Sequence, residues 1–437
     1  MMNIREIALK LLSEIEDGGK YANLAISSRL TDNLSPKEKR ILTALVYTAV
    51  EHKITYDYYI GYLAGRGIDE IAPRIRNILR LGLCQLLHMS TVPDFAAVAE
   101  TVKLAKNQGE RAFVNGVLRR AAREKDSLPL PARKKNVARH LSVKYSYPQA
   151  TVKRFIEALG EEECEKLLLA FETANYTDIT VNTLKITPAE LASRLCEQGY
   201  SAHASELSPI TVRIDGSVDP RSLFGFEEGL FFVQDTASAV AAQACSAREG
   251  DLVVDVCSAP GGKSFASAIL SGDKAEIHSF DLHSSKLSLI EGGRDRLGLT
   301  SITVAEQDAT APRTELVGRA DRVICDVPCS GLGVLAKKPD LRYKDIAVVD
   351  ELCALSREIL EKSASYLKVG GVLAFSTCTL EKRENTDTVL SFLASHPDFS
   401  AVDFAVGELH STRGELTLYP HVHGTDGFYI ALIRRDR

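Results

Sequence analysis

Apolar residues recur at every third or fourth position from Ile4 to about Leu118, which is the period of an amphipathic helix. Strand-type alternation is absent from this stretch, and proline-containing turns interrupt the helical pattern. At one such turn, residues 35–38 read Ser-Pro-Lys-Glu, which combines a capping residue, an early proline and an acid three positions after the cap. The pattern predicts an all-α bundle of about six to eight short helices.

The pattern changes twice beyond this bundle. Residues 127–136 are rich in proline and basic residues and follow neither period, so we expect a linker there. Residues 137–245 mix helical periods with short β-branched runs, which predicts a small α+β region. Within it we expect helices over residues 150–159, 162–171, 188–198 and 236–244, and strands over residues 179–184, 211–214 and 230–233.

From residue 251 onward, β-branched runs alternate with helical patterns, as in a Rossmann-like, doubly wound α/β domain with a mostly parallel sheet. A last β-rich run, residues 424–433, predicts a further strand that is antiparallel and lies at the sheet edge. The other expected strands cover residues 252–256, 276–280, 301–305, 322–325 and 372–376. We therefore divide the chain into a helical domain (1–126), a linker (127–136), an α+β extension (137–245) and an α/β domain (246–437).

The composition is that of an ordinary globular protein, with 437 residues of which 45% are hydrophobic and 25% are charged. No run of about 18 uninterrupted apolar residues occurs, and the first residues lack a secretory segment, so we expect a soluble cytoplasmic protein with no membrane partner. The nine cysteines, an odd number with no dense framework, fit a reducing compartment. None of them forms a C-x-x-C pair, so we expect no zinc site and no other metal centre.

Charge is distributed unevenly along the chain. Residues 1–150 hold 24 Lys and Arg against 15 Asp and Glu, whereas the remaining residues hold 29 against 43. The basic first third predicts contact with a polyanion such as a nucleic acid, because neutralised phosphates dominate sequence-independent binding. The alternative is an ordinary solvated helical surface, which lysine and arginine also cover.

One stretch, residues 253–264, combines the features of a ligand-binding turn. A β-branched run ends at Asp255, a Pro-Gly-Gly turn follows, and then a helical pattern begins. In an open parallel sheet such a turn lies at the carboxyl edge, where ligands bind. A phosphate-binding P-loop would share the final Gly-Lys-Ser but needs glycine in place of Cys257. The other alternative is a turn whose glycines serve geometry alone.

Further polar residues follow the other expected strands. Asp281 ends the second strand, where a carboxylate accepts hydrogen bonds from ribose hydroxyls in nucleotide-binding sheets. Asp308 lies just past the third strand, where it could meet an adenine amino group. Asp326 and Cys329 follow the fourth strand, and Cys378 follows the fifth. A single cysteine is usually buried and inert, but two thiols at successive strand ends beside a ligand turn predict reactive groups.

Three strings in this part of the chain resemble the motifs of the RNA cytosine-5 methyltransferases, which use S-adenosylmethionine. The strings are Cys257-Ser258-Ala259-Pro260-Gly261-Gly262-Lys263, Asp326-Val327-Pro328-Cys329-Ser330-Gly331 and Ser376-Thr377-Cys378-Thr379. Residues 96–105 and 113–119 resemble the closing helices of NusB-like RNA-binding domains. The likeness extends nearly end to end and is strongest to bacterial members that modify 16S rRNA. One departure is Ser258, where the family more often has alanine.

The resemblance implies an activity and a role for each site residue. The protein would methylate C5 of a cytosine in 16S rRNA or its precursor, cytosine 967, with Cys378 as the nucleophile and Cys329 assisting release. Asp326 would hydrogen-bond the base or the cofactor. The cofactor S-adenosylmethionine would be bound by Asp281, Asp308, Asp326 and the loop residues Cys257, Ser258, Ala259, Pro260, Gly261, Gly262 and Lys263.

The reaction itself requires a thiol. Cytosine C5 is too weak a nucleophile to take a methyl group from a sulfonium, so a thiolate must first add at C6. The target base must also leave any stack to reach the sheet edge. Lys337, Lys338 and Arg342 are candidate phosphate contacts, with a solvated surface as the alternative.

Alternative assignments remain at this point. Cytosine-5 DNA methyltransferases attack with the cysteine of a Pro-Cys motif, which would exchange the roles of Cys329 and Cys378; the Thr377-Cys378 pair favours the RNA arrangement. A tRNA substrate, and a non-catalytic RNA-binding or ribosome-assembly protein on the same scaffold, are the rival functions.

Overall fold

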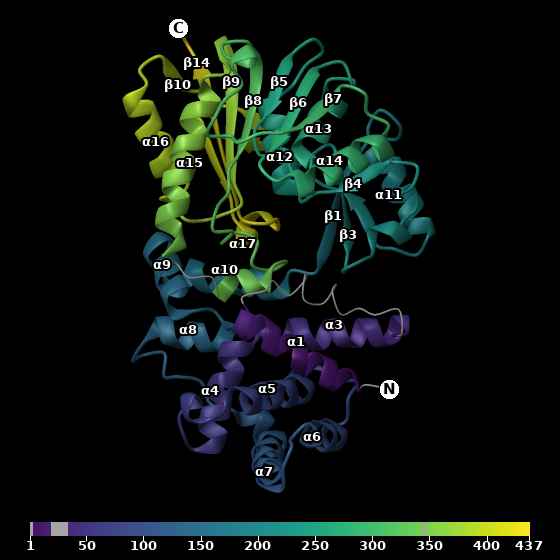
Figure 1. The fold of residues 1–437 in the computed structure, drawn as a ribbon, viewed down its shortest axis with the longest axis vertical. Helices are drawn as coiled ribbons and strands as arrows, with labels where there is room; N and C mark the ends of the chain where they lie inside the picture. Colours follow the sequence, from purple (N-terminus) through teal and green to yellow (C-terminus); the bar gives the residue numbers. More distant parts are fainter. Residues whose placement is uncertain (1–2, 19–33, 344–346) are drawn as a thin grey trace. The chain divides into compact units, whose positions relative to one another are not determined.

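The computed structural model describes residues 3–18, 34–343 and 347–437 (Figure 1). Its backbone contacts divide the chain into two compact units. The first, which we call the helical unit, contains Met1–Leu169 together with Lys337–Lys344. The second, the sheet unit, contains Ala170–Ala336 and Asp345–Arg437. Within the described ranges, no helix is both long enough and apolar enough to cross a bilayer.

Helices build the described part of the helical unit, as the apolar period predicts. They are α1 (Ile4–Gly18), α3 (Pro36–Glu51), α4 (Lys53–Ala64), α5 (Pro73–His88), α6 (Asp94–Val102), α7 (Gln108–Glu124), α8 (Val137–Tyr145), α9 (Gln149–Leu159) and α10 (Glu161–Thr173), which continues into the sheet unit. The expected cap of α3 is present: the Ser35 N–H donates to Glu38 Oε2 at 2.8 Å, and the Glu38 N–H donates to Ser35 Oγ at 3.3 Å.

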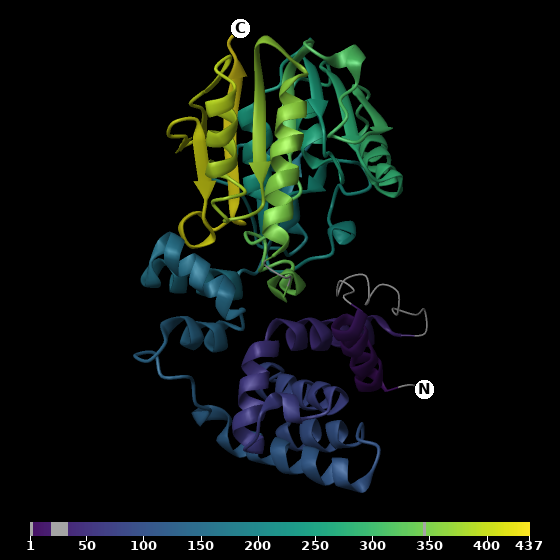
Figure 2. The same cartoon turned by 60° about the vertical axis from the view of Figure 1, so that its left-hand side comes forward.

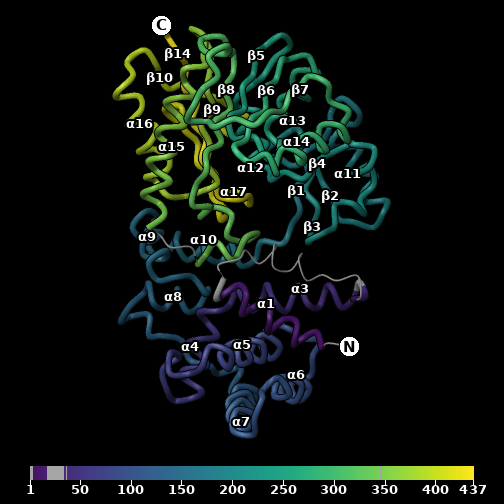
Figure 3. The backbone as a smooth tube through the Cα atoms, viewed as in Figure 1, coloured from purple at the N-terminus to yellow at the C-terminus, as the bar shows by residue number. Residues whose placement is uncertain are grey.

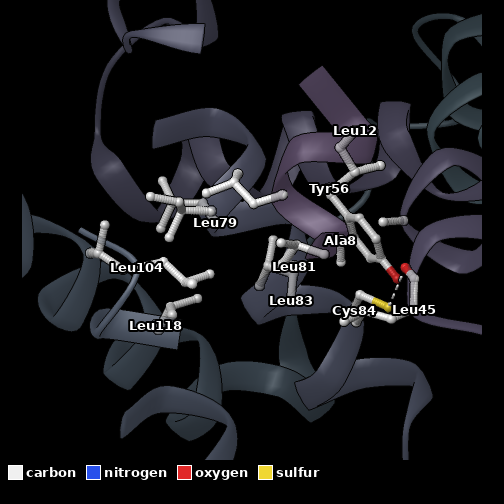
Figure 4. Close-up of a cluster of buried hydrophobic side chains, with 14 of the residues drawn as sticks. Ala8, Leu12, Leu45, Tyr56, Leu79, Leu81, Leu83, Cys84, Leu104 and Leu118 are labelled. Atoms are coloured by element: carbon white, nitrogen blue, oxygen red, sulfur yellow. Dashed lines mark hydrogen bonds between the residues drawn. The ribbon is translucent and has the colours of Figure 1, made fainter. Parts of the chain in front are cut away.

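The core of the helical unit is centred on α5, which is buried on nearly every side (Figure 4). Leu79, Leu81 and Leu83 of α5 pack with apolar residues of α1, α3, α4 and α7. A helix that is apolar around most of its circumference is stable only when its neighbours cover it. Cys84 is part of this core, and burial raises the pKa of its thiol to about 12, which favours the neutral, unreactive form.

A segment from much later in the chain completes the helical unit. Pro339–Tyr343 forms a short 3-10 turn, η5. The Arg342 side chain is 1% exposed, its Nη2 lies 2.9 Å from Glu51 Oε1, and its guanidinium stacks over the Tyr147 ring at 4.2 Å. The Tyr343 hydroxyl donates to the Val50 carbonyl at 2.8 Å. The prediction that Arg342 contacts phosphate is therefore wrong, because its side chain is buried and paired with Glu51 inside the protein. Lys337 and Lys338 are exposed.

The sheet unit begins with a small antiparallel sheet of order β2-β3-β1-β4. Its strands are β1 (Tyr176–Val181), β2 (Ala202–Ala204), β3 (Thr211–Asp215) and β4 (Phe231–Val233), and helix α11 (Pro188–Glu197) packs on it. The strand expected as far as residue 184 ends at Val181, since the Asn182 side chain turns to donate to the carbonyls of Gly229 and Leu297. Helix α12 (Thr236–Cys245) follows.

The large sheet has the order β10-β14-β9-β8-β5-β6-β7, and β13 pairs with β14. Its strands are β5 (Leu252–Asp255), β6 (Glu276–Asp281), β7 (Ile302–Glu306), β8 (Ala320–Asp326), β9 (Leu367–Thr377), β10 (Phe399–Ala401), β13 (Glu415–Leu418) and β14 (Phe428–Arg435). Strands β5 to β9 are parallel, as predicted. Strand β14 is antiparallel as predicted but does not lie at the edge, because β10 and β13 pair with it.

Helices cover both faces of the large sheet. One core combines α12, α13 (Gly262–Leu270) and α14 (Ser284–Leu297) with one set of strand side chains. The other combines α15 (Val348–Ala364) and α16 (Thr386–Ser395) with the alternate set, and Figure 2 brings α15, in light green, to the front of the sheet. Successive residues Val253 and Val254 therefore point into different cores.

The path of the chain determines where a ligand can bind. From β5 the chain adds β6 and β7 on one side, and it then crosses over to add β8 and β9 on the other (Figure 3). The helices after β5 and β8 consequently pack on opposite faces of the sheet, and in open parallel sheets ligands bind at the carboxyl ends of the strands where the order reverses in this way. The ligand-binding turn and both candidate thiols follow strands at this edge.

Candidate active site at the carboxyl edge of the large sheet

A buried carboxyl group, that of Asp255, anchors the loop between β5 and α13. Asp255 is 1% exposed, Ser264 Oγ donates to its Oδ2 at 2.7 Å, and Ser279 Oγ donates to Ser264 Oγ at 2.6 Å. Burial raises the pKa of Asp255 to about 7, against the smaller opposing effect of the Ser264 hydrogen bond. Asp255 thus anchors the first turn of α13 from within the protein.

The top of the loop requires glycine. Gly261 has a φ of 107°, and a Cβ built there would lie 2.4 Å from Cζ of Phe265. The same ring tip would lie 2.5 Å from a Cβ on Gly293 of α14. The tip of the Phe265 ring therefore lies against both the loop and α14, and the ring centroid of Phe232 lies 5.5 Å from that of Phe265, with the two rings nearly perpendicular.

The acids after β6 and β7 differ in their surroundings. Asp281 is 6% exposed and accepts hydrogen bonds from the loop N–H of Ala259 at 3.3 Å and from the His283 N–H at 3.0 Å. Asp308 is exposed and accepts from the backbone and the hydroxyl of Thr310, and these bonds hold its pKa below the ordinary value. Asp281 is therefore built into the loop, whereas Asp308 follows the adjacent strand in a separate local turn.

Asp326, at the end of β8, connects the loop to β9. Lys263 Nζ lies 2.6 Å from Asp326 Oδ2, and Ser376 Oγ donates to Asp326 Oδ1 at 2.6 Å. The Lys263 side chain is 9% exposed and its amino group lies over the Phe428 ring at 5.2 Å. This arrangement disfavours the P-loop alternative, because the lysine that would grip a phosphate is buried in an ion pair with a carboxylate.

The two candidate thiols meet at this edge. Cys329 Sγ and Cys378 Sγ are 3.4 Å apart, and both side chains are partly exposed. The Gly333 N–H donates to the Cys378 carbonyl at 3.0 Å, which ties the loop after β8 to the end of β9. The hydrogen bond to Cys378, together with burial, raises the pKa of Cys329 well above its ordinary value.

Cys257 lies in the loop but in a different chemical environment. Burial raises the pKa of its thiol well above the usual range, and Cys325, Asp255, Asp326 and Asp281 act in the same direction. A thiol that faces carboxylates is stabilised in its neutral form. This environment fits a residue that lines the loop and does not fit a nucleophile.

Two residues of the edge were not anticipated from the sequence. Glu384 is fully buried and accepts hydrogen bonds from the Ser330 backbone and hydroxyl, and Asn385 bonds Thr377 and Thr379. Both lie in an irregular turn between β9 and α16 that has no apolar period. The only signal in the sequence is an acid and an amide shortly after the second thiol.

The donor set fits S-adenosylmethionine. Carboxylates follow β6, β7 and β8 beside the loop, where they can accept hydrogen bonds from ribose hydroxyls and an amino group and can oppose a cationic sulfonium. Cys329 and Cys378 lie in the loops that follow the neighbouring strands β8 and β9, at the same edge of the sheet. Among the residues that the structure describes, no group of three or more His, Cys, Asp or Glu could hold a metal ion.

Comparisons with known proteins agree with this geometry. Residues 242–434 match the family described as 16S rRNA methyltransferase RsmB/F, residues 2–123 match the NusB family, and residues 147–220 match the ferredoxin-like domain of RsmF/B-like methyltransferases. A crystal structure of the protein PH0851 covers 100% of this chain and 99% of its own, with a TM-score of 0.80 and 27% identity.

Curated relatives match over the full length. "Probable ribosomal RNA small subunit methyltransferase B" of Bacillus subtilis is 34% identical over 99% of both chains. The protein of the same name in Synechocystis sp. is 36% identical over 100% of both chains. The chain therefore belongs to the 16S rRNA methyltransferase RsmB/F family and is an S-adenosylmethionine-dependent RNA methyltransferase.

Proposed function

We propose that the protein methylates C5 of a cytosine in 16S rRNA through a covalent bond between a cysteine and C6 of the base. The observation that carries this proposal is the 3.4 Å separation of Cys329 and Cys378 at the ends of the neighbouring strands β8 and β9, beside the cofactor loop. Two thiols at one sheet edge suit a reaction in which a nucleophile must be added to the base and later removed.

S-adenosylmethionine supplies an electrophilic methyl group when it is bound. Asp281 can accept hydrogen bonds from the ribose hydroxyls, and Asp308 can accept one from the adenine amino group. The loop residues 257–263, whose Ala259 N–H bonds Asp281, would offer backbone N–H groups to the cofactor. In this assignment Lys263 holds Asp326 in place and leaves its Oδ1 bonded to Ser376.

Cys378 is the nucleophile in our proposal. Its thiolate adds to C6: a sulfur lone pair forms the C6–S bond, and the π electrons of the C5–C6 double bond shift to give an enamine whose nucleophilic carbon is C5. C5 would then attack the methyl carbon while the bond from that carbon to the sulfonium sulfur breaks, and the resulting thioether would leave. C5 then loses its proton to a base, and the electrons of the broken C5–H bond re-form the C5–C6 double bond and expel the thiolate from C6. Asp326 lies at the same edge and can hydrogen-bond the base. Cys329 assists the elimination step.

The helical unit supplies RNA contacts in the same proposal. Arg111, Arg119 and Arg123 are exposed on α7 and are separated by multiples of four residues, so they lie along one face of the helix. Lys134 and Lys135 are exposed shortly after this helix. Such a row suits contact with a phosphate backbone and requires no particular base sequence.

The test uses labelled S-adenosylmethionine with small-subunit rRNA, tRNA and DNA, followed by bisulfite mapping of the labelled RNA. Label in a single cytosine of 16S rRNA is the expected result, whereas label only in tRNA would overturn the rRNA assignment. If the unmutated chain binds RNA but transfers no methyl group, the non-catalytic alternative replaces the proposal.

Two cysteine variants test the division of roles. Cys378→Ala is expected to abolish both methyl transfer and covalent RNA, because the nucleophile is gone. Cys329→Ala is expected to accumulate RNA that stays attached to the protein through denaturing electrophoresis, because elimination is slowed. The reverse pattern would assign the nucleophile to Cys329, as in the DNA enzymes.

A further inference from the structure

The residues next to the two thiols are joined by a buried hydrogen-bond network. Ser330, which follows Cys329, donates its N–H to Glu384 Oε1 at 2.8 Å and its hydroxyl to Glu384 Oε2. The Ser330 hydroxyl also lies 2.8 Å from the hydroxyl of Thr379, which follows Cys378. The Glu384 carboxylate therefore binds the residue after Cys329 directly, and the Ser330 hydroxyl links it to the residue after Cys378.

The next residue along the chain holds the second thiol from both sides. Asn385 Oδ1 accepts a hydrogen bond from the Thr377 hydroxyl at 2.5 Å, and its Nδ2 donates to the Thr379 carbonyl at 2.9 Å. Thr377 and Thr379 flank Cys378. Asn385 is 4% exposed and Glu384 is 0% exposed, so water competes little for these bonds.

We infer that Glu384 and Asn385 are positioning residues that hold Cys329 and Cys378 at a fixed separation by binding the residues next to each thiol. This inference deepens the proposed function and rests on its two-thiol chemistry. The hydrogen bonds of both side chains run to Ser330, Thr377 and Thr379, so their effect on the reaction passes through the placement of the two sulfur atoms.

Burying the Glu384 carboxyl group costs free energy, so its hydrogen bonds to Ser330 must offset part of that cost. Burial raises the pKa of Glu384 above the ordinary value, and the two hydrogen bonds from Ser330 oppose that rise. A neutral apolar residue would fill the space without this cost but would leave the N–H of Ser330 unsatisfied. The network gives up some stability for a defined geometry of the thiol loops.

The separation of the thiols can be measured without RNA or cofactor. Diamide takes up the two thiol hydrogens and is reduced to its hydrazine while Cys329 and Cys378 form a disulfide, and the rate of that step depends on how long the sulfur atoms stay together. Alkylation of the remaining thiols followed by peptide mass spectrometry identifies the pair. For the folded, unmutated full chain we expect this disulfide as the major product.

Four variants carry the test. Glu384→Ala and Asn385→Ala are expected to slow disulfide formation about tenfold or more and to lower kcat for methyl transfer by up to about 100-fold, with little change in KM for S-adenosylmethionine. Glu384→Gln is expected to recover most of both rates, because its amide can accept from the Ser330 N–H and donate to the Ser330 hydroxyl. Glu358→Ala, an exposed change on α15, is the matched control.

The outcomes separate this inference from the proposed function. If Glu384→Ala and Asn385→Ala form the disulfide and turn over as fast as Glu358→Ala, the inference is overturned. If Glu384→Ala fails to fold, Ser330→Ala replaces it, because that change removes the hydroxyl bond and leaves the backbone bond. If the unmutated chain methylates no cytosine but the variants still slow the disulfide, the proposed function fails while the positioning role stands.

Discussion

Two adjacent glycines in α14 provide a sharp test of the packing behind the cofactor loop. A Cβ added at Gly292 meets no atom within 4 Å, whereas a Cβ added at Gly293 would lie 2.5 Å from Cζ and 2.7 Å from Cε2 of Phe265. Both positions are inside the helix. Gly292→Ala and Gly293→Ala therefore make the same chemical change on the same element and differ only in what the new methyl group meets.

The expected energies follow from this difference. Replacing glycine with alanine inside a helix stabilises it by about 0.5–1 kcal/mol, because the unfolded chain loses freedom. At Gly293 the methyl group must also move a buried ring by roughly 1 Å to reach normal contact distance, and overpacking of this kind costs about 1–3 kcal/mol. We expect Gly292→Ala to raise the free energy of unfolding. The free energy of unfolding of Gly293→Ala should be about 1–3 kcal/mol lower than that of Gly292→Ala.

The strain at Gly293 should also reach the cofactor. The tip of the Phe265 ring also lies against Gly261, so moving the ring disturbs its packing against the loop between β5 and α13. We expect KM for S-adenosylmethionine to rise in Gly293→Ala, by about tenfold for each 1.4 kcal/mol transmitted, and to stay unchanged in Gly292→Ala. Urea denaturation and steady-state kinetics measure the two effects. Equal unfolding free energies for the two variants would refute the reasoning.

Three further predictions concern charge and thiols. The pKa of Asp255 is raised from 3.8 to about 7 in the folded chain, so between these pH values the unfolded chain binds fewer protons and the free energy of unfolding falls as pH rises. Asp255→Asn should remove about 2–3 kcal/mol of the fall in free energy of unfolding that urea denaturation measures between pH 5 and 8. An unchanged pH dependence in this variant would contradict the raised pKa. In the Cys329→Ala background, Cys257→Ala should still form covalent RNA in a gel assay, and loss of that adduct would contradict our assignment of Cys257. Arg119→Ala and Arg123→Ala should each weaken filter-bound RNA and lower the slope of log affinity against log salt by about 1, and the same slope as the unmutated chain would remove α7 from the RNA surface.

The sequence predicts the parts of the fold that periodicity controls. Each strand from β5 to β9 overlaps its expected range, because a β-branched run between helical patterns has few other structures open to it. The expected position of β14 is wrong because periodicity reports which side of a strand is buried and not which strands lie beside it. Strand β2 has three residues, too few for a period to be seen.

Polar residues are harder to place than strands. Arg342 reads as one more basic residue beside Lys337 and Lys338, yet it is buried against Glu51 and Tyr147. A paired cation and a solvated one look the same in a sequence, because the pairing depends on a residue 291 positions away. The thiols could be predicted because parallel strand ends share one edge; the residues that hold them could not, since they lie in an irregular turn.

The 3-10 turn Pro339–Tyr343 has a consequence for dissecting the protein. A fragment that ends at Leu169 contains the rest of the helical unit but lacks the segment that pairs with Glu51 and bonds the Val50 carbonyl. A fragment that begins at Ala170 carries that segment with nothing from the helical unit for it to bind. The helical unit is thus built from two segments that are far apart in the sequence. A truncated protein or a fusion protein that contains only residues 1–169 would therefore lack part of it.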